Sequence, residues 1–132
     1  MRVLATGSRH WTDVAVIKEV LLSVQGERPS EFMTLVHGAQ VSKDRKTFVK
    51  YGADYLAGEV AKQLGWKVET FPAEWERYGR RAGPVRNQLM VDHKADVCVV
   101  FPMPDSRGTW DCVRRAKKAR IPLVISTKYV DA

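Results

Sequence analysis

The sequence of 132 residues is 45% hydrophobic, 9% aromatic and 28% charged, with a formal net charge of +7. This length fits a single domain spanning residues 1–132, and the composition excludes a disordered chain. No apolar run approaches the length of a membrane span and no signal-peptide core follows the N-terminus, so we expect a cytoplasmic protein that contacts no membrane. The two cysteines, Cys98 and Cys112, lack the spacing of metal ligands or a disulfide framework. We expect two buried thiols, no metal ion and no cofactor.

Much of the positive charge lies near the end of the sequence, in Arg114, Arg115, Lys117, Lys118 and Arg120. Cations in the last turns of a helix complement its dipole, so a solvated helix face accounts for them. The sequence shows no interleaving of aromatic and basic residues and no duplex-recognition motif. Nucleic-acid binding is therefore an alternative, not the favoured interpretation.

The first predicted element is a strand from Arg2 to Thr6, followed by the loop Gly7-Ser8-Arg9. A helix beginning at Thr12 or Asp13 comes next, and its predicted buried side holds Val14, Ile17, Leu21 and Val24. Gly7 permits close backbone approach and Arg9 can contact an anion. The motif is short, so a plain loop is the simpler explanation of these residues taken alone.

A second strand is predicted from Phe32 to His37, after which Gly38 begins the longest irregular stretch, with a loop insert at about 40–51. A connection of this length is typical of a lid or binding loop, although a short helix over residues 46–51 is an alternative. Asp54 starts the next helix. Its favoured role is to cap free N–H groups, and its alternative role is to bind a ligand hydroxyl.

The third predicted strand runs from Lys67 to Phe71 and leads into a second long loop over residues 72–83. Pro84 suits the first position of a helix, which places Arg86 and Asn87 in its first turn and buries Leu89 and Met90. An arginine at a helix N-terminus opposes the dipole, so Arg86 is expected to face an anion or pair with a carboxylate.

The run Val97 to Phe101 is the pattern of a parallel strand covered on both faces. Pro and Gly residues then end the strand, and Thr109 is placed to cap the next helix. Free backbone N–H groups around Ser106, Gly108 and Thr109 favour a phosphate or carboxylate. An ordinary strand-to-helix turn explains the same residues about equally well.

A last strand from Leu123 to Ser126 gives five strands alternating with four helices. This alternation predicts an α/β fold: a single Rossmann-like doubly wound parallel sheet of about five strands with helices on both faces. The predicted strand order 3-2-1-4-5 reverses between the first and fourth strands, where such sheets bind ligands. The loops after these two strands should therefore converge, with Arg86 close by.

Several motifs together resemble a known superfamily: TGSRHW, HGA, GAD, FPAEW, AGPVRNQLM and GTWDCVRRAKKARIPLV. In order and spacing they are similar to the SLOG superfamily of Rossmann-like nucleotide-binding proteins, and within it to the small stand-alone YspA-type members of bacteria and phages. The superfamily also contains DprA, which takes part in DNA uptake, and the LOG phosphoribohydrolases. The resemblance implies a nucleotide or nucleotide-like ligand and a homo-oligomer.

The sequence departs from the LOG enzymes where those carry their catalytic residues. The Arg-Lys pair of LOG enzymes becomes Arg86-Asn87, and Cys112 stands where LOG enzymes have a glutamate, with Asp111 one residue earlier. A carboxylate stabilises an oxocarbenium-like transition state in a way that a cysteine does not. Arg86 and Asp111 are therefore the catalytic candidates only if this protein cleaves N-glycosidic bonds, and whether it is an enzyme stays open.

The favoured function is binding of a nucleotide or nucleotide-derived molecule, ADP-ribose-like or a signalling nucleotide, by a sensor or sequestering protein. The alternatives are a LOG-like nucleoside monophosphate phosphoribohydrolase and DprA-like nucleic-acid binding. The predicted ligand-binding residues are Gly7, Ser8, Arg9, Gly38, Asp54, Arg86, Asn87, Ser106, Gly108 and Thr109. Trp11, Trp75 and Tyr78 can stack on a base, but burial as core anchors is their favoured role, and His37 is expected to satisfy a local hydrogen bond.

Overall fold

The computed structural model describes residues 1–130. Its main sheet has five parallel strands in the order β5-β2-β1-β6-β7. The strands are β1 (Arg2–Gly7), β2 (Thr34–His37), β5 (Lys67–Thr70), β6 (Val97–Phe101) and β7 (Leu123–Ile125). Numbered within this sheet alone, the order is 3-2-1-4-5, so the predicted Rossmann-like fold and its switch point between β1 and β6 are confirmed.

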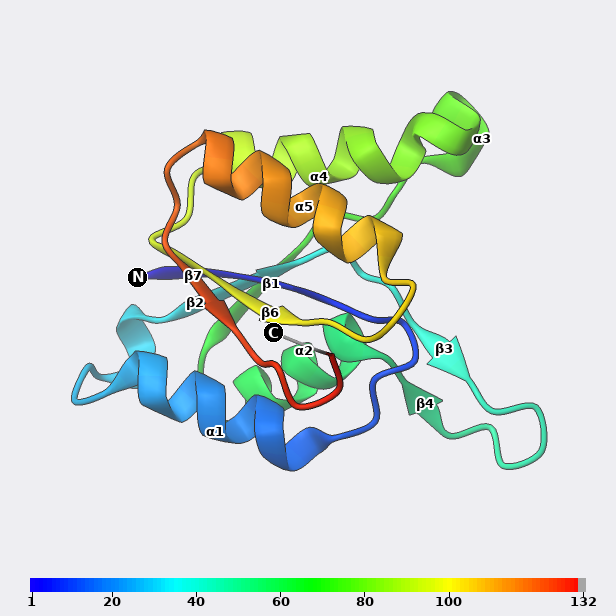
Figure 1. The fold of residues 1–132 in the computed structure, drawn as a ribbon. Helices are drawn as coiled ribbons and strands as arrows, with labels where there is room; N and C mark the ends of the chain where they lie inside the picture. Colours follow the sequence, from blue (N-terminus) through cyan, green and yellow to red (C-terminus); the bar gives the residue numbers. More distant parts are fainter. Residues whose placement is uncertain (131–132) are drawn as a thin grey trace.

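Helices cover both faces of this sheet (Figure 1). One face carries α1 (Val14–Gln25) and α2 (Ala53–Gln63), and the other carries α4 (Ala82–Asp92) and α5 (Arg107–Lys118). The four-residue helix α3 (Trp75–Tyr78) and two 3₁₀ turns, Ser30–Phe32 and Gly79–Arg81, complete the helical elements of the described residues. None of these helices is long and apolar enough to cross a membrane.

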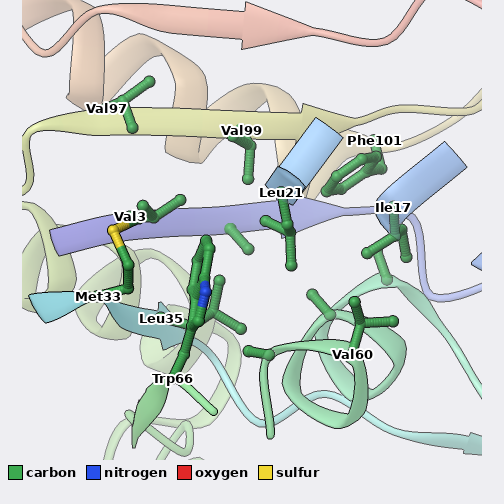
Figure 2. Close-up of a cluster of buried hydrophobic side chains, with 14 of the residues drawn as sticks. Val3, Ile17, Leu21, Met33, Leu35, Val60, Trp66, Val97, Val99 and Phe101 are labelled. Carbon is green, nitrogen blue, oxygen red and sulfur yellow. The ribbon is translucent and has the colours of Figure 1, made fainter. Parts of the chain in front are cut away.

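Strand β6 is buried along its whole length, as its sequence predicts. Its side chains alternate between two apolar clusters because successive residues of a strand face opposite sides of the sheet. Val97, Val99 and Phe101 pack with residues of α1 and α2 (Figure 2), whereas Cys98 and Val100 pack with residues of α4 and α5. Both cysteines are buried free thiols, in agreement with the expectation.

Two of the predicted helices each have one exposed residue where a buried one was expected. Val14 begins α1 and is 44% exposed, while Leu89 lies on the outer side of α4 and is 46% exposed. In each helix the buried stripe runs through other positions, Ile17 and Leu21 in α1 and Met90 and Val91 in α4. The predicted helices are present, but one position of each buried stripe was wrong.

The insert at about 40–51 is a β-hairpin, so the predicted irregular loop and the alternative short helix are both wrong. Two-residue strands β3 (Ser42–Lys43) and β4 (Lys50–Tyr51) pair antiparallel. At the tip, the Asp44 carboxylate accepts hydrogen bonds from the backbone N–H groups of Lys46 and Thr47, each at 2.8 Å. Phe48 has a φ of 61°, a conformation that bulky residues rarely adopt. The hairpin projects from the carboxyl edge of the sheet (Figure 1).

The predicted loop over residues 72–83 is largely helical. It contains α3 and the 3₁₀ turn Gly79–Arg81, and α4 begins at Ala82, two residues before Pro84. Proline is tolerated there because the first N–H groups of a helix have no intrahelical acceptor. Arg86 and Asn87 consequently lie in the second turn of α4. The prediction that placed them in the first turn was wrong.

Candidate functional site

A cleft of about 860 Å³ opens at the carboxyl edge of the sheet, at the point between β1 and β6 where the strand order reverses. The loop after β1 and the loop after β6 both line it, as predicted, together with the first half of α4. The predicted ligand-binding residues found in its lining are Gly7, Ser8, Arg9, Asp54, Arg86, Asn87, Ser106, Gly108 and Thr109. Asp111 lines the cleft as well, whereas Gly38 lies behind the Arg86 guanidinium.

Gly7 and Ser8 build the floor of the cleft. A Cβ on Gly7 would stand 2.6 Å from the Ala53 Cβ and 2.7 Å from the Phe101 carbonyl oxygen, so only glycine fits between β6 and the start of α2. The Ser8 N–H donates to the Phe101 carbonyl at 2.9 Å, and the Ser8 carbonyl accepts from the Ala53 N–H at 3.0 Å. These bonds hold the backbone that presents Arg9 at the rim.

Asp54 is buried at the base of the cleft and does not cap α2, so the favoured prediction for it was wrong. It is the second residue of the helix, after the N-cap Gly52, and its Oδ2 accepts from the backbone N–H of Gln40 at 3.2 Å. Burial raises the pKa of this carboxyl to about 6, against the opposing effects of the Gln40 hydrogen bond and the Arg86 charge. The charged carboxylate is thus desolvated and lines a cleft.

Arg86 reaches across from α4 to the segment after β2. Its guanidinium donates to the Gly38 carbonyl and, through Nε at 2.9 Å, to Asn87 Oδ1. Within residues 1–130, no carboxylate forms an ion pair with Arg86, so the expected carboxylate pairing is not found. The positive charge of Arg86 lies close enough to Asp54 to oppose the rise in its pKa.

His37 ends β2 beside this arginine. Its Nδ1 accepts from the backbone N–H of Ala39 at 2.9 Å, which confirms the expected local hydrogen bond. Burial lowers the pKa of the imidazole to about 4, and the charges of Lys62 and Arg86 act in the same direction. The ring is therefore neutral at pH 7 and serves as a hydrogen-bond acceptor.

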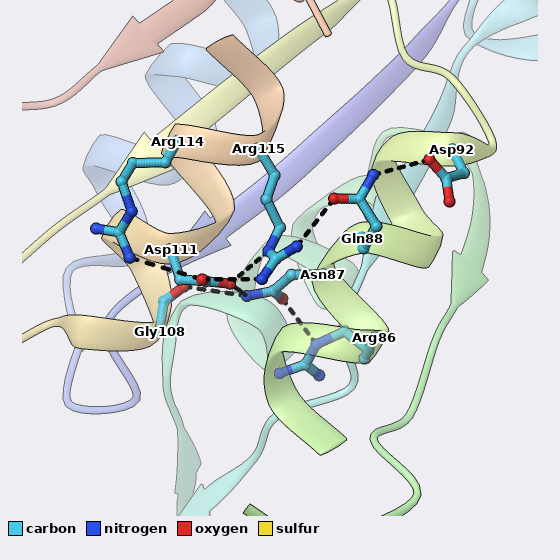
Figure 3. A network of polar contacts seen from close by, with 8 residues as sticks. All are labelled: Arg86, Asn87, Gln88, Asp92, Gly108, Asp111, Arg114 and Arg115. Carbon is cyan, nitrogen blue, oxygen red and sulfur yellow. Dashed lines mark hydrogen bonds and ion pairs between the residues drawn. The ribbon is translucent and has the colours of Figure 1, made fainter. Parts of the chain in front are cut away.

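A polar network joins α4 to α5 along one wall of the cleft (Figure 3). Asn87 donates through Nδ2 to the Gly108 carbonyl at 3.2 Å and to Asp111 Oδ2 at 3.0 Å. Arg115 donates through Nε to Asp111 Oδ2 at 2.9 Å and through Nη1 to Gln88 at 2.9 Å. Partial burial opposes ionisation of Asp111, but hydrogen bonds from Arg115 and Asn87 outweigh it and lower its pKa. Asp111 is consequently an ionised, paired residue.

Helix α5 starts three residues earlier than predicted, so Thr109 is not its cap. The N-cap is Ser106, whose Oγ accepts from the Met103 N–H at 3.0 Å, and Thr109 is a buried residue of the first turn. Space around Gly108 is open, with no atom within 4 Å of the position of a Cβ. Gly108 and Thr109, in the first turn of α5, line the cleft, and the helix dipole favours negative charge at this end of the helix.

The lining residues that had not been predicted as ligand contacts include His10, Gln40, Trp75, Arg107 and Arg114. Arg107 stands directly before Gly108 in the loop singled out from the sequence, and this position was the available signal. Arg114 belongs to the helix face assigned to solvent. Trp75 was expected to be a core anchor but is 57% exposed, whereas Trp11 is fully buried as expected.

An all-parallel, doubly wound sheet with a cleft at its switch point defines a Rossmann-like α/β protein. The sequence comparisons narrow this class. A family model described as "YspA, cpYpsA-related SLOG family" matches residues 1–78. The chain is also 38% identical over 128 residues to the "Gene 61 protein" of Mycobacterium phage D29, covering 93% of this chain and 94% of that protein. The chain belongs to the YspA, cpYpsA-related SLOG family, and this membership points to a nucleotide-related function.

Proposed function

We propose that the protein binds a nucleotide or nucleotide-derived small molecule in the cleft between β1 and β6, as a sensor or sequestering protein. The observation that carries this proposal is the combination, in one cleft, of the exposed cations Arg9 and Arg107 with the buried carboxyl of Asp54. Cations attract phosphate, and a buried carboxylate at a cleft is suited to accept hydrogen bonds from ribose hydroxyls. An ADP-ribose-like molecule or a signalling nucleotide carries both groups.

The two cations come from the two loops that meet at the switch point. Arg9 follows β1 and Arg107 begins α5, and in residues 1–130 neither side chain forms an ion pair. The first turn of α5 adds free backbone N–H groups near Gly108 and Thr109. A phosphate between these groups would be bound from both sides of the cleft, while Asp54 would accept hydrogen bonds from the sugar.

Hydrolysis by this site is the weaker proposal. Asp111, the carboxylate nearest in sequence to the LOG glutamate, is held by Asn87 and Arg115 and lies 3.6 Å from Arg114 Nη2. Its negative charge is neutralised within the protein, which reduces its ability to stabilise a cationic sugar. We therefore expect a bound nucleotide to stay intact.

Thermal-shift screening against nucleotides, ADP-ribose and cyclic dinucleotides, with mass spectrometry of each hit, tests the proposal. A ligand that binds only the native state raises the Tm. Arg107→Ala should abolish the shift, whereas Lys118→Ala, which removes one charge from the exposed far end of the same helix, should not. Cleavage of a hit into base and ribose phosphate would show that the protein is a hydrolase instead. If no compound of the panel raises the Tm, the proposal that the cleft binds a nucleotide is refuted.

The hairpin provides an observation for the second candidate, nucleic-acid binding. It carries Lys43, Arg45, Lys46 and Lys50 beside Phe48, which is 67% exposed, and the Lys43 Nζ lies 5.4 Å from the Phe48 ring centroid. Folding therefore interleaves cations with an aromatic side chain. A steep loss of single-strand affinity with salt, together with sensitivity to Lys43→Glu but not to Arg107→Ala, would distinguish this surface from the cleft.

We also propose a homo-oligomer, for which exposed apolar side chains on helix faces, such as Leu22 and Leu89, provide the support. Multi-angle light scattering gives the mass in solution, and a monomer at micromolar concentration would refute it.

A further inference from the structure

Trp75 differs from the other three tryptophans of the chain. Trp11 and Trp66 are buried and Trp110 packs against the second apolar cluster, whereas Trp75 is 57% exposed and lines the cleft. It is the first residue of α3, which Figure 1 shows beyond the start of α4, toward the carboxyl edge of the sheet. The indole of Trp75 is therefore much less buried than those of Trp11 and Trp66, and it gains less stabilisation from burial.

Packing and hydrogen bonding do not account for its position. The indole N–H of Trp11 donates to the Asp13 carbonyl and that of Trp66 to Gln25 Oε1, both at 2.9 Å. Within residues 1–130, the indole N–H of Trp75 has no such acceptor, and α3 contains no buried residue. Its Cη2 lies 3.6 Å from where a Cβ on Gly83 would stand, an ordinary van der Waals distance, so only the edge of the ring lies against the start of α4.

The cleft lining has two chemically different parts. Trp75, Pro84 and Met90 contribute apolar surface from α3 and α4, while Arg9 and Arg107 contribute positive charge from the loops after β1 and β6. A free phosphate or a sugar phosphate would use only the charged part. A nucleotide has a planar apolar base at one end and phosphate at the other, and its two ends match the two parts.

We propose that Trp75 is the platform on which the base of the bound nucleotide stacks, and that the ligand class is nucleotides carrying a planar heteroaromatic base. This inference rests on the proposed nucleotide-binding function and assigns it a base subsite. Stacking uses the π-face that every base has, so purines are expected to bind more tightly than pyrimidines through their larger area, without strict discrimination by base edge.

Titration of the full chain with AMP, ADP-ribose and the base-free ribose 5-phosphate, followed by tryptophan fluorescence and by calorimetry, tests the proposal. AMP and ADP-ribose should quench the emission, and ribose 5-phosphate should not. Trp75→Phe should lose the quenching yet keep most of the affinity, since an aromatic face remains. Trp75→Ala should weaken the binding of AMP and ADP-ribose by about ten- to a hundredfold and leave the affinity for ribose 5-phosphate unchanged.

The control is Trp110→Phe, which removes a tryptophan packed outside the cleft and should retain the quenching. Circular dichroism and Tm establish that each variant is folded, as expected for Trp75 from its exposure. Quenching and affinity that survive Trp75→Ala would overturn the base platform while leaving nucleotide binding intact. Failure of AMP, ADP-ribose and every other nucleotide of the panel to bind would overturn the proposed function and this inference together.

Discussion

The guanidinium of Arg86 occupies the space that a side chain on Gly38 would need. The two residues are 48 positions apart, one in α4 and one directly after β2. The Gly38 carbonyl accepts a hydrogen bond from Arg86 Nη1, and the three atoms that would lie nearest to a Cβ on Gly38 all belong to this arginine. Glycine at position 38 and arginine at position 86 are therefore a matched pair that fastens the segment before the hairpin to α4.

The first prediction uses this pair as a double-mutant cycle. Gly38→Ala should destabilise the protein by about 1 kcal/mol, because its methyl group displaces the guanidinium, the flexible end of Arg86, from its hydrogen bond to the Gly38 carbonyl. In an Arg86→Ala background the same change should cost less than about 0.5 kcal/mol, since the obstructing atoms are gone. Urea unfolding of the four proteins measures the coupling. Additive effects would show that the two residues do not share this space in solution.

The second prediction concerns the Asp54 carboxyl, whose pKa is raised from 3.8 to about 6. A raised carboxyl pKa means that the folded state disfavours ionisation, so the penalty is absent below about pH 4, grows between pH 4 and 6 and is complete above pH 6. Asp54→Asn should therefore be more stable than the natural protein by about 2–3 kcal/mol at pH 7.5, and this gain should vanish at pH 3.5.

Chemical denaturation of both proteins across this pH range provides the measurement, and the difference between them removes the contribution of other titrating groups. The same variant should bind AMP or ADP-ribose more weakly, because the amide offers the ribose hydroxyls a poorer acceptor than the carboxylate. If Asp54→Asn gains stability but binds AMP and ADP-ribose as tightly as the natural protein, Asp54 does not contact the ligand.

The third prediction compares two glycines of the cleft. Gly7→Ala should destabilise the protein by about 1–3 kcal/mol, since the new methyl would meet the Phe101 carbonyl and the Ala53 side chain. Gly108→Ala is the matched control: it lies in α5 with open space around it, and alanine should be neutral or stabilise the helix by up to about 1 kcal/mol. The Tm of Gly7→Ala should fall, whereas that of Gly108→Ala should rise or stay the same. Equal losses would refute the close packing at Gly7.

The fourth prediction concerns the contact between α4 and α5. Asp111→Asn should lower stability by about 1 kcal/mol, because it removes the charge that Arg115 and Asn87 contact. The pKa of Asp111 is lowered, so its contribution is present above about pH 4 and is lost as the pH falls further. Glu59→Gln, which affects only an exposed pair with Lys62, should change stability little.

Mass spectrometry of nucleotides incubated with the natural protein and with Asp111→Asn gives the second readout. Both should leave the nucleotide intact. Cleavage by the natural protein that Asp111→Asn abolishes would make Asp111 catalytic despite its ion pairs.

The strand order and the position of the cleft were predictable because the sequence patterns behind them are strong and do not depend on exact helix or strand boundaries. The apolar run of β6 predicts a buried strand without knowledge of the strands beside it. The alternation of strands and helices is compatible with only a few sheet topologies. Once the order was fixed, the loops after β1 and β6 had to meet. The position of Arg9 and Gly108 at one cleft follows from topology alone.

The errors occurred where tertiary contacts override local preference. Thr109 and Asp54 were both placed as helix caps, but Ser106 and Gly52 take those positions. A helix start can shift by two or three residues without any change in apolar spacing. The hairpin was missed because its strands have only two residues and its turn uses Phe48 at positive φ, which no turn signature announces. The burial predicted for Trp75 was wrong because the exposure of an indole depends on which residues the fold packs against it, and the local sequence does not show them.

The central position of β1 has a consequence for how the chain is made. β1 pairs with β2 on one side and with β6 on the other, and its Val3 lies opposite Val97. During synthesis the first strand has one edge open until the fourth strand of the sheet has left the ribosome, and an open apolar edge invites pairing with other chains. Since α5 supplies part of the cleft, the cleft is completed only after that edge closes, so a nucleotide cannot assist the early steps of folding.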